Sequence, residues 1–138
     1  MANPHSTLTR RDDTFVNTAY LPAAAASNYS TAMDLENVAG APVYKFGMEV
    51  VVAAAPNNTD NTKTITLTLY DSANGSSYAE VAPRIQCRIV GVASTGSVAT
   101  TFRFLPPPGL RRYVKSFQEV AAGGGDNTGV LVTYALTF

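Results

Sequence analysis

Residues 63–70 read Lys-Thr-Ile-Thr-Leu-Thr-Leu-Tyr and decide the fold of this chain. Apolar side chains at Ile65, Leu67 and Leu69 alternate with threonines. Because successive side chains of an extended strand point to opposite faces, this strict period of two predicts a β-strand with one buried and one solvent-facing side. The polar run at 71–76 then predicts a turn.

The same period recurs on both sides of this strand. Residues 43–54 alternate in the same way, and the polar run 57–61 joins them to 63–70, so we expect the two segments to pair as a hairpin. No segment shows a sustained helical period. Further strands are expected at 31–36, 85–92, 98–105, 110–121 and 129–138.

This pattern predicts an all-β fold, a single antiparallel jelly-roll or β-sandwich domain over residues 31–138. Residues 1–30 differ in composition, with a charged cluster at 10–13 and an alanine run at 23–26 behind Pro22. Pro22 and the polar residues after the run bracket it too closely for a stable helix. We therefore expect residues 1–30 to form an extended N-terminal arm.

Composition limits the classes of function. Ten basic and ten acidic residues cancel, so no overall field draws the chain toward nucleic acid or an anionic membrane. Only 14% of the residues are charged, against about 25% in a typical soluble protein, so the surface must consist largely of Thr, Ser, Asn and Ala. No apolar run reaches the roughly 18 residues of a membrane span, and the first residues lack the apolar core of a signal peptide. We expect a protein made and kept in a cytosol-like compartment that recognises partners by shape and local contacts, with no direct contact to nucleic acid or membrane.

Candidates for catalysis or metal binding are few. His5 is the sole histidine and Cys87 the sole cysteine, so neither a standard zinc site nor a nucleophile paired with a histidine can be assembled within the fold. Asp34 and Glu36 would share one strand face and could form a carboxylate or Ca²⁺ site, although a solvated strand edge explains them equally well. We expect no enzyme activity, no metal and no cofactor.

Two further features have a structural and a chemical interpretation. Cys87 lies on the same face of its expected strand as Ile85 and Ile89, which favours a buried small hydrophobe over a reactive thiol. The glycine-rich run 123–129 joins two expected strands and lacks the Gly-Lys-Ser/Thr of a phosphate loop, so we expect a flexible hairpin loop.

The stretch 105–114 is the most informative about binding. It reads Leu-Pro-Pro-Pro-Gly-Leu-Arg-Arg-Tyr-Val, in which the prolines favour a stiff, extended connection and the glycine can take the positive φ that turns the chain. Rigidity lowers the entropy cost of docking. The two arginines would project to opposite sides of the next strand, so that one pairs within the domain and the other reaches a partner carboxylate. The alternative interpretation is a rigid loop between sheets with no partner.

Residues 105–114, the glycine-rich turn and the alternating strand 130–138 resemble the capsid cement (decoration) proteins of tailed bacteriophages, and most closely the cement protein of short-tailed Bordetella phages. The resemblance implies a dimeric jelly-roll subunit on the outside of an icosahedral head, which ties together neighbouring major capsid proteins. It therefore implies the major capsid protein and a second copy of the chain as partners, and the exterior of the virion as the location.

A receptor- or carbohydrate-binding β module of a phage head fibre or spike is the alternative. Because the chain has no tryptophan, its seven tyrosines are the candidates for stacking against a sugar. Under the cement hypothesis, the arm and the proline corner form the binding surface. The expected protein-binding residues are Arg10, Arg11, Tyr20, Pro106, Pro107, Pro108, Gly109, Arg111 and Arg112.

Overall fold

The structure is a computed structural model that describes residues 11–35 and 47–137, with the backbone alone for 11–15. These ranges contain ten β-strands and no helix, in agreement with the predicted all-β class. The strands are β1 (Arg11–Tyr20), β2 (Ser27–Tyr29), β3 (Met33–Asp34), β4 (Gly47–Val52), β5 (Thr64–Ser72), β6 (Ala79–Glu80), β7 (Gln86–Val90), β8 (Thr100–Phe104), β9 (Tyr113–Val120) and β10 (Leu131–Thr137).

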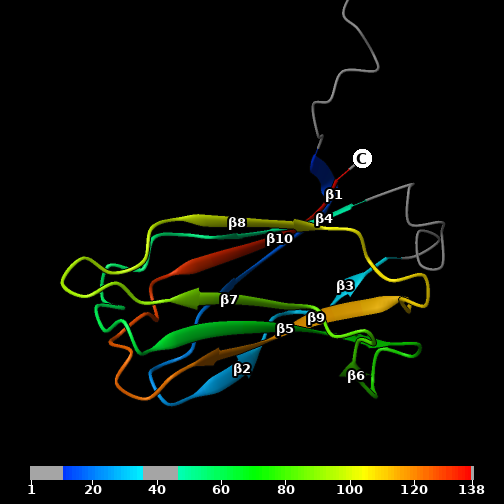
Figure 1. Cartoon of the computed structure of the whole chain (residues 1–138). Coiled ribbons are helices and arrows are strands. Elements are labelled where there is room, and N and C mark those ends of the chain that lie inside the picture. Colours follow the sequence, from blue (N-terminus) through cyan, green and yellow to red (C-terminus); the bar gives the residue numbers. More distant parts are fainter. Residues whose placement is uncertain (1–10, 36–46, 138) are drawn as a thin grey trace, which may run out of the picture.

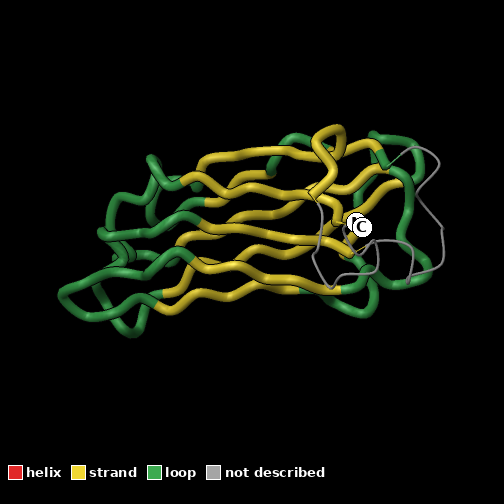
Figure 2. Tube along the Cα trace, turned by 90° about the horizontal axis from the view of Figure 1, so that it is seen from above, coloured by secondary structure: helices red, strands yellow, loops and turns green. Residues whose placement is uncertain are grey.

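The strands form two antiparallel sheets that pack face to face. Sheet A has the order β1-β10-β4-β8, and sheet B has the order β2-β9-β5-β6, with β7 also on β5 and β3 also on β9. Figure 1 shows sheet A above sheet B, and Figure 2 shows that the strands run along the long axis with the loops gathered at the two ends. The arrangement confirms the predicted β-sandwich.

The pairing is nested around the middle of the chain. β5 pairs with β7, β4 with β8, β2 with β9, and β1 with β10, so the first strand lies beside the last. A chain folded back on itself in this way and wrapped into two sheets is a jelly roll. All of these pairs are antiparallel.

The core lies between the inner faces of the two sheets, where the alternation placed it. On β5, Ile65, Leu67 and Leu69 are buried, while the threonines between them lie on the outer face. The C-terminal strand β10 follows the expected pattern as well, with Val132, Tyr134 and Leu136 in the core. The other inward residues of the predicted strands are Met48, Val50, Val52, Cys87, Ile89, Val114 and Val120.

The predicted hairpin between 43–54 and 63–70 is wrong. β4 belongs to sheet A and pairs with β10 and β8, whereas β5 belongs to sheet B. The polar run between them therefore crosses from one sheet to the other. Alternation fixes which face of a strand is buried, but two amphipathic strands satisfy it equally by pairing or by packing face to face.

The predicted arm over 1–30 is also wrong for residues 11–30, while residues 1–10 lie outside the described residues. β1 pairs with β10 along Val16–Tyr20, β2 pairs with β9, and Leu21 between them is 2% exposed. β1 is an edge strand with polar residues on both faces, so it carries no clear alternation. Its place in the fold comes from tertiary pairing that a local pattern does not encode.

A buried polar network ties this N-terminal segment to both sheets. Gln118 of β9 is fully buried, and its amide oxygen accepts a 2.7 Å hydrogen bond from the hydroxyl of Tyr134 on β10. Its amide nitrogen donates to the Tyr20 carbonyl at 3.0 Å and to Asn28 Oδ1 at 2.8 Å. The side chain thus joins β9 and β10 across the core and joins both to the ends of β1 and β2, with every one of its hydrogen-bonding groups in use.

We expect Gln118→Leu to lower the free energy of unfolding by about 2–4 kcal/mol, because it leaves the Tyr134 hydroxyl, the Tyr20 carbonyl and Asn28 Oδ1 without this partner in or near the core. Tyr134→Phe removes one bond of the same network and should cost about 1–2 kcal/mol. Urea unfolding followed by far-UV circular dichroism measures both. Equal costs for the two variants would show that the bonds to the N-terminal segment add nothing.

Candidate interaction surfaces

The proline corner joins β8 of sheet A to β9 of sheet B at one end of the sandwich. Pro106 is buried, whereas Pro108 and Gly109 are exposed. The amide of Leu110 donates to the Pro107 carbonyl at 3.1 Å, which closes a tight turn, and the Leu110 side chain returns to the core. Gly109 is not among the residues with positive φ, and nothing lies within 4 Å of the place a Cβ would take. The expected left-handed conformation of this glycine is therefore wrong, and the corner turns without it.

Arg111 fastens the corner to sheet B. Its Nε and Nη2 donate to Asp71 Oδ1 at 2.9 and 2.6 Å, and its backbone amide donates to Asp71 Oδ2 at 2.9 Å. The Asp71 side chain, on β5, is only 7% exposed. Hydrogen bonding to Asp71 raises the pKa of the Arg111 guanidinium, so this group stays protonated. A charge-assisted, two-atom contact of this kind fixes orientation as well as position.

Arg112 pairs with Asp34 of β3, which borders β9 on the side opposite β5. Its Nε and Nη2 donate to the two carboxylate oxygens of Asp34 at 2.7 and 2.9 Å, and its guanidinium carbon lies 5.1 Å from the centre of the Tyr113 ring. The two arginines therefore project to opposite sides, as predicted. The expectation that one would be left to reach a partner is not met within the fold, because each binds a carboxylate of its own chain.

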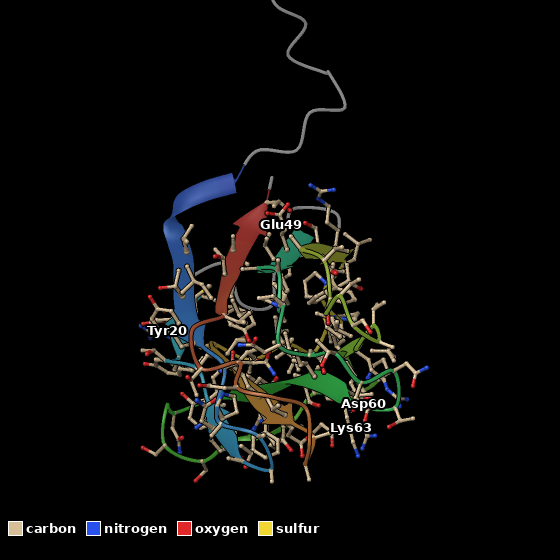
Figure 3. The ribbon with its side chains drawn as sticks, turned by 90° about the vertical axis from the view of Figure 1, so that its left-hand side faces the viewer. Tyr20, Glu49, Asp60 and Lys63 are labelled. Atoms are coloured by element: carbon tan, nitrogen blue, oxygen red, sulfur yellow. The ribbon has the colours of Figure 1, made fainter. Side chains whose placement is uncertain are left out.

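The structure separates the remaining predicted contact residues. Arg10 lies outside the described residues, and Arg11 begins β1 opposite Thr137, at the same end as the corner. Tyr20 is opposite Leu131 at the other end of the sandwich, where it is 59% exposed. Figure 3 shows Tyr20 on the β1 side, away from Asp60 and Lys63. Tyr20 and the proline corner therefore do not form one continuous surface.

Sequence reasoning missed an aliphatic edge on the side of the sandwich opposite β1. Four of the six exposed large hydrophobic residues among the described ones lie on β7, on β8 or directly beside them, at 48–77% exposure. In the described part of the chain, β7 pairs only with β5 and β8 only with β4, so both are edge strands. We call this set the aliphatic edge; it consists of Val90, Val92, Val98 and Leu105.

Sequence reasoning also missed an aromatic cluster on the outer face of sheet B. Tyr29 of β2, Phe117 of β9 and Tyr70 of β5 are mutual neighbours, with ring centres 4.9–5.9 Å apart. Lys115 Nζ lies 4.0 Å from the centre of the Tyr29 ring and 3.9 Å from that of Tyr78. We call these five residues the aromatic face. Period-two alternation puts Tyr70 and Phe117 on the outer side, but only the strand order brings Tyr29 beside them.

The glycine-rich run 123–129 is a loop with specific packing contacts. It joins β9 of sheet B to β10 of sheet A, so the predicted hairpin is wrong. Gly125 has a φ of 77°, and a Cβ there would lie 2.1 Å from the Asn57 carbonyl oxygen. Asn57 Nδ2 in turn donates to the Asp126 carbonyl at 2.7 Å. The loop thus packs closely on 55–58, which explains the need for glycine.

The remaining candidates for chemistry stay apart. Among the described side chains, no three of His, Cys, Asp or Glu lie close enough to hold a metal ion. Asp34 pairs with Arg112, while Glu36 and His5 lie outside the described residues. The described strands and loops include no helix long and apolar enough to cross a membrane.

Cys87 is buried against the core as expected, with 5% exposure. Loss of hydration raises the pKa of its thiol to about 11, from an ordinary 9.0. The neutral thiol is therefore favoured in the folded state, which agrees with the hydrophobic interpretation.

Comparison with known proteins adds fold information only. No protein family profile and no curated protein sequence match the chain. Among solved structures, the PBSX exported protein XepA superposes on 98% of this chain and 39% of its own, with a TM-score of 0.51 and 13% identity. The chain thus spans about two fifths of the length of that neighbour. The CBM22-1-GH10 modules of Clostridium thermocellum endo-1,4-β-D-xylanase 10B, complexed with xylohexaose, cover 94% of this chain and 25% of their own, with a TM-score of 0.34 and 11% identity. The first likeness shows the sandwich fold, and the second is too weak to support an argument.

We expect Arg111→Ala to lower the urea midpoint of unfolding more than Arg112→Ala. The first change leaves the buried Asp71 carboxylate without its guanidinium, whereas the second breaks a pair whose carboxylate and guanidinium are 38% and 51% exposed. The two neighbouring residues form a matched pair of variants. Midpoints that fall by the same amount would show that the Asp71 contact does not hold the corner.

We expect Cys87 to resist thiol labelling at pH 8 in the native protein and to react fully in urea, because burial holds the pKa near 11. The raised pKa also makes the stability of the fold depend on pH. The folded protein favours the neutral thiol, so this contribution is complete below pH 9 and is lost as the pH rises toward 11. Unfolding measured at pH 8 and pH 10 should therefore show a larger loss for the native sequence than for Cys87→Ala. Rapid labelling of the native protein would contradict both expectations.

Proposed function

We propose that this chain is a structural virion protein that binds the exterior of an icosahedral phage head and cements neighbouring major capsid proteins. The resemblance of residues 105–114 and 130–138 to phage cement proteins motivates the proposal. The jelly-roll fold agrees with it, and the PBSX exported protein XepA shares the sandwich fold. The proposal needs a surface suited to binding another protein, which the described strands provide.

The aliphatic edge is the observation that carries the proposal. Single exposed hydrophobic residues are common on proteins, but four aliphatic side chains on or beside two edge strands favour an interaction site there. Val98 at 77% and Leu105 at 64% exposure stand at the two ends of β8. An edge strand also offers unpaired backbone amides and carbonyls to a partner. Apolar contact and backbone hydrogen bonding therefore coincide on this side of the sandwich.

The charge on β8 is already paired. Arg103 on the outer face of β8 donates to Glu49 of β4 at 3.0 Å, and the Glu49 side chain is 9% exposed. A partner that covers the edge would not have to strip water from an isolated Glu49 carboxylate. The edge is thus suited to a flat protein surface.

Cementing would stabilise the head through the coupling of binding to assembly. A protein that binds only the assembled shell stabilises that shell by mass action, in the same way that a ligand stabilises the fold it binds. A two-fold dimer of the chain would bridge two equivalent sites and raise the effective concentration of the second contact. We therefore propose a homodimer and the major capsid protein as partners, with the virion exterior as the location.

We expect the purified chain to co-sediment with expanded heads assembled from the major capsid protein of the same phage, and to bind free capsid subunits poorly. The double variant Val98→Asp/Leu105→Asp should bind the heads at least tenfold more weakly, because two charges replace apolar contact area in the interface. Sedimentation with a dilution series of the chain measures the affinity. Binding equal to that of the native sequence would exclude the aliphatic edge as the docking surface.

The matched control is Ser76→Asp/Ser77→Asp, which adds the same charge at two exposed residues of the turn between β5 and β6. It should leave head binding unchanged. Both double variants should keep the urea midpoint of the native chain, because all four side chains are exposed. Failure of the native chain itself to bind heads would overturn the proposed function.

A further inference from the structure

The outer face of sheet B carries an ordered row of side chains across four strands. Tyr29 of β2 lies opposite Phe117 of β9, Phe117 opposite Thr68 of β5, and Thr68 opposite Gln86 of β7. Gln86 Nε2 donates to Thr68 Oγ1 at 3.1 Å. One half of the row is therefore aromatic and the other half hydrogen-bonding.

The aromatic half is held in a fixed arrangement. The rings of Tyr29 and Phe117 are tilted by 34° with centres 4.9 Å apart, and Tyr70 meets both edge-on at 5.7 and 5.9 Å. Lys115 lies over Tyr29 and over Tyr78, so a cation–π contact braces the cluster from one side. Tyr29 nevertheless remains 49% exposed. The cluster is thus preorganised, and Tyr29 stays half exposed within it while Lys115 lies over its ring.

The neighbouring row supplies polar groups. Glu119 of β9 lies opposite Thr66 of β5, and Thr66 lies opposite Arg88 of β7. Glu119 and Arg88 are exposed. The planar acceptor Glu119 and the planar donor Arg88 thus lie two residues along their strands from Phe117 and Gln86.

The chemistry of this face differs from that of the aliphatic edge. The outward residues of β9 are Tyr113, Lys115, Phe117 and Glu119, and those of β5 are threonines, Tyr70 and Ser72, so neither strand exposes an aliphatic side chain there. The centres of protein interfaces are depleted in Lys and Glu, because removing such charges from water is costly. A protein partner therefore suits the edge better than this face.

We propose that the outer face of sheet B binds an oligosaccharide, with one sugar unit packed on the half-exposed Tyr29 and held by Glu119 through its hydroxyl groups, and a further unit of the same glycan held by Arg88, three strands away. A pyranose ring has an apolar face of C–H bonds that packs on an aromatic ring, and a rim of hydroxyl groups that pairs with planar polar side chains. The proline corner and the aliphatic edge take no part.

The inference goes beyond cementing and is independent of it. Val98 and Leu105 of the aliphatic edge flank β8 of sheet A, whereas the aromatic face lies on the outside of sheet B, so the first can be covered by a capsid while the second faces the medium. The alternative expected from the sequence, a carbohydrate-binding module, had no assigned site. The aromatic face gives that activity a location within a virion protein.

The test is a glycan microarray of bacterial surface polysaccharides and neutral plant oligosaccharides, probed with the fluorescently labelled full chain. We expect binding to a limited set of glycans. On those glycans Tyr29→Ala should weaken binding at least tenfold, because the stacking ring is lost. Tyr29→Phe should keep most of it, because Phe retains the ring. The residue is half exposed on a short strand, so neither variant should lower the urea midpoint by much.

The edge variant Val98→Asp/Leu105→Asp serves as the matched control and should bind glycans as the native chain does. No binding of the native chain to any arrayed glycan would overturn the inference, as would binding that Tyr29→Ala leaves unchanged. Weaker sedimentation of Tyr29→Ala with phage heads, without glycan binding, would show a protein-binding face instead. Failure of the edge variant on heads leaves the glycan result intact, so the two proposals fail separately.

Discussion

The side-chain amide of Gln118 is the contact on which the rest of the structure depends. A polar group in the middle of a sandwich is costly unless every bond it can make is made, and here its partners come from β10, from the end of β1 and from β2. Two of those partners, Tyr20 and Asn28, belong to the N-terminal segment, which the sequence pattern placed outside the β domain. The buried amide of Gln118 therefore has all its hydrogen-bond partners only when residues 20–28 are in place.

The nested strand order explains why this requirement arises. In a jelly roll the first strand pairs with the last, so residues far apart in the chain must meet before either edge of sheet A is complete. The register of β1 against β10 brings Tyr20 opposite Leu131, directly beside the Gln118 contact. Contacts of such long sequence separation slow folding, since the entropy of closing the chain is lost before the contacts form. An extended arm that folds only on its partner would avoid this cost, but the amide of Gln118 would then lack partners.

Alternation in the sequence predicts the class of the fold and most of the core, because the period of two fixes the buried face of each strand independently of its neighbours. The inward residues of β4, β5, β7 and β10 all follow from it. It does not specify pairing, which is why β4 and β5 could be mistaken for a hairpin. It also fails for β1 and β2, since the former is a polar edge strand and the latter is only three residues long. For such segments the register of neighbouring strands decides what local preference leaves open.

The interaction surfaces were hidden from the sequence for the same reason. The prolines and arginines of the corner stand out in a linear reading, yet both arginines are engaged by carboxylates that lie 40 and 78 residues away in the chain. Val98 and Tyr29 are inconspicuous in the sequence, and their exposure follows from strand order alone. That order places β7 and β8 at the edge of their sheets and sets β2 beside β9, so it separates an aliphatic edge from an aromatic face. Because β8 borders sheet A and the aromatic cluster covers the outside of sheet B, one rigid sandwich can hold a protein at Val98 and Leu105 and leave Tyr29 open to another ligand.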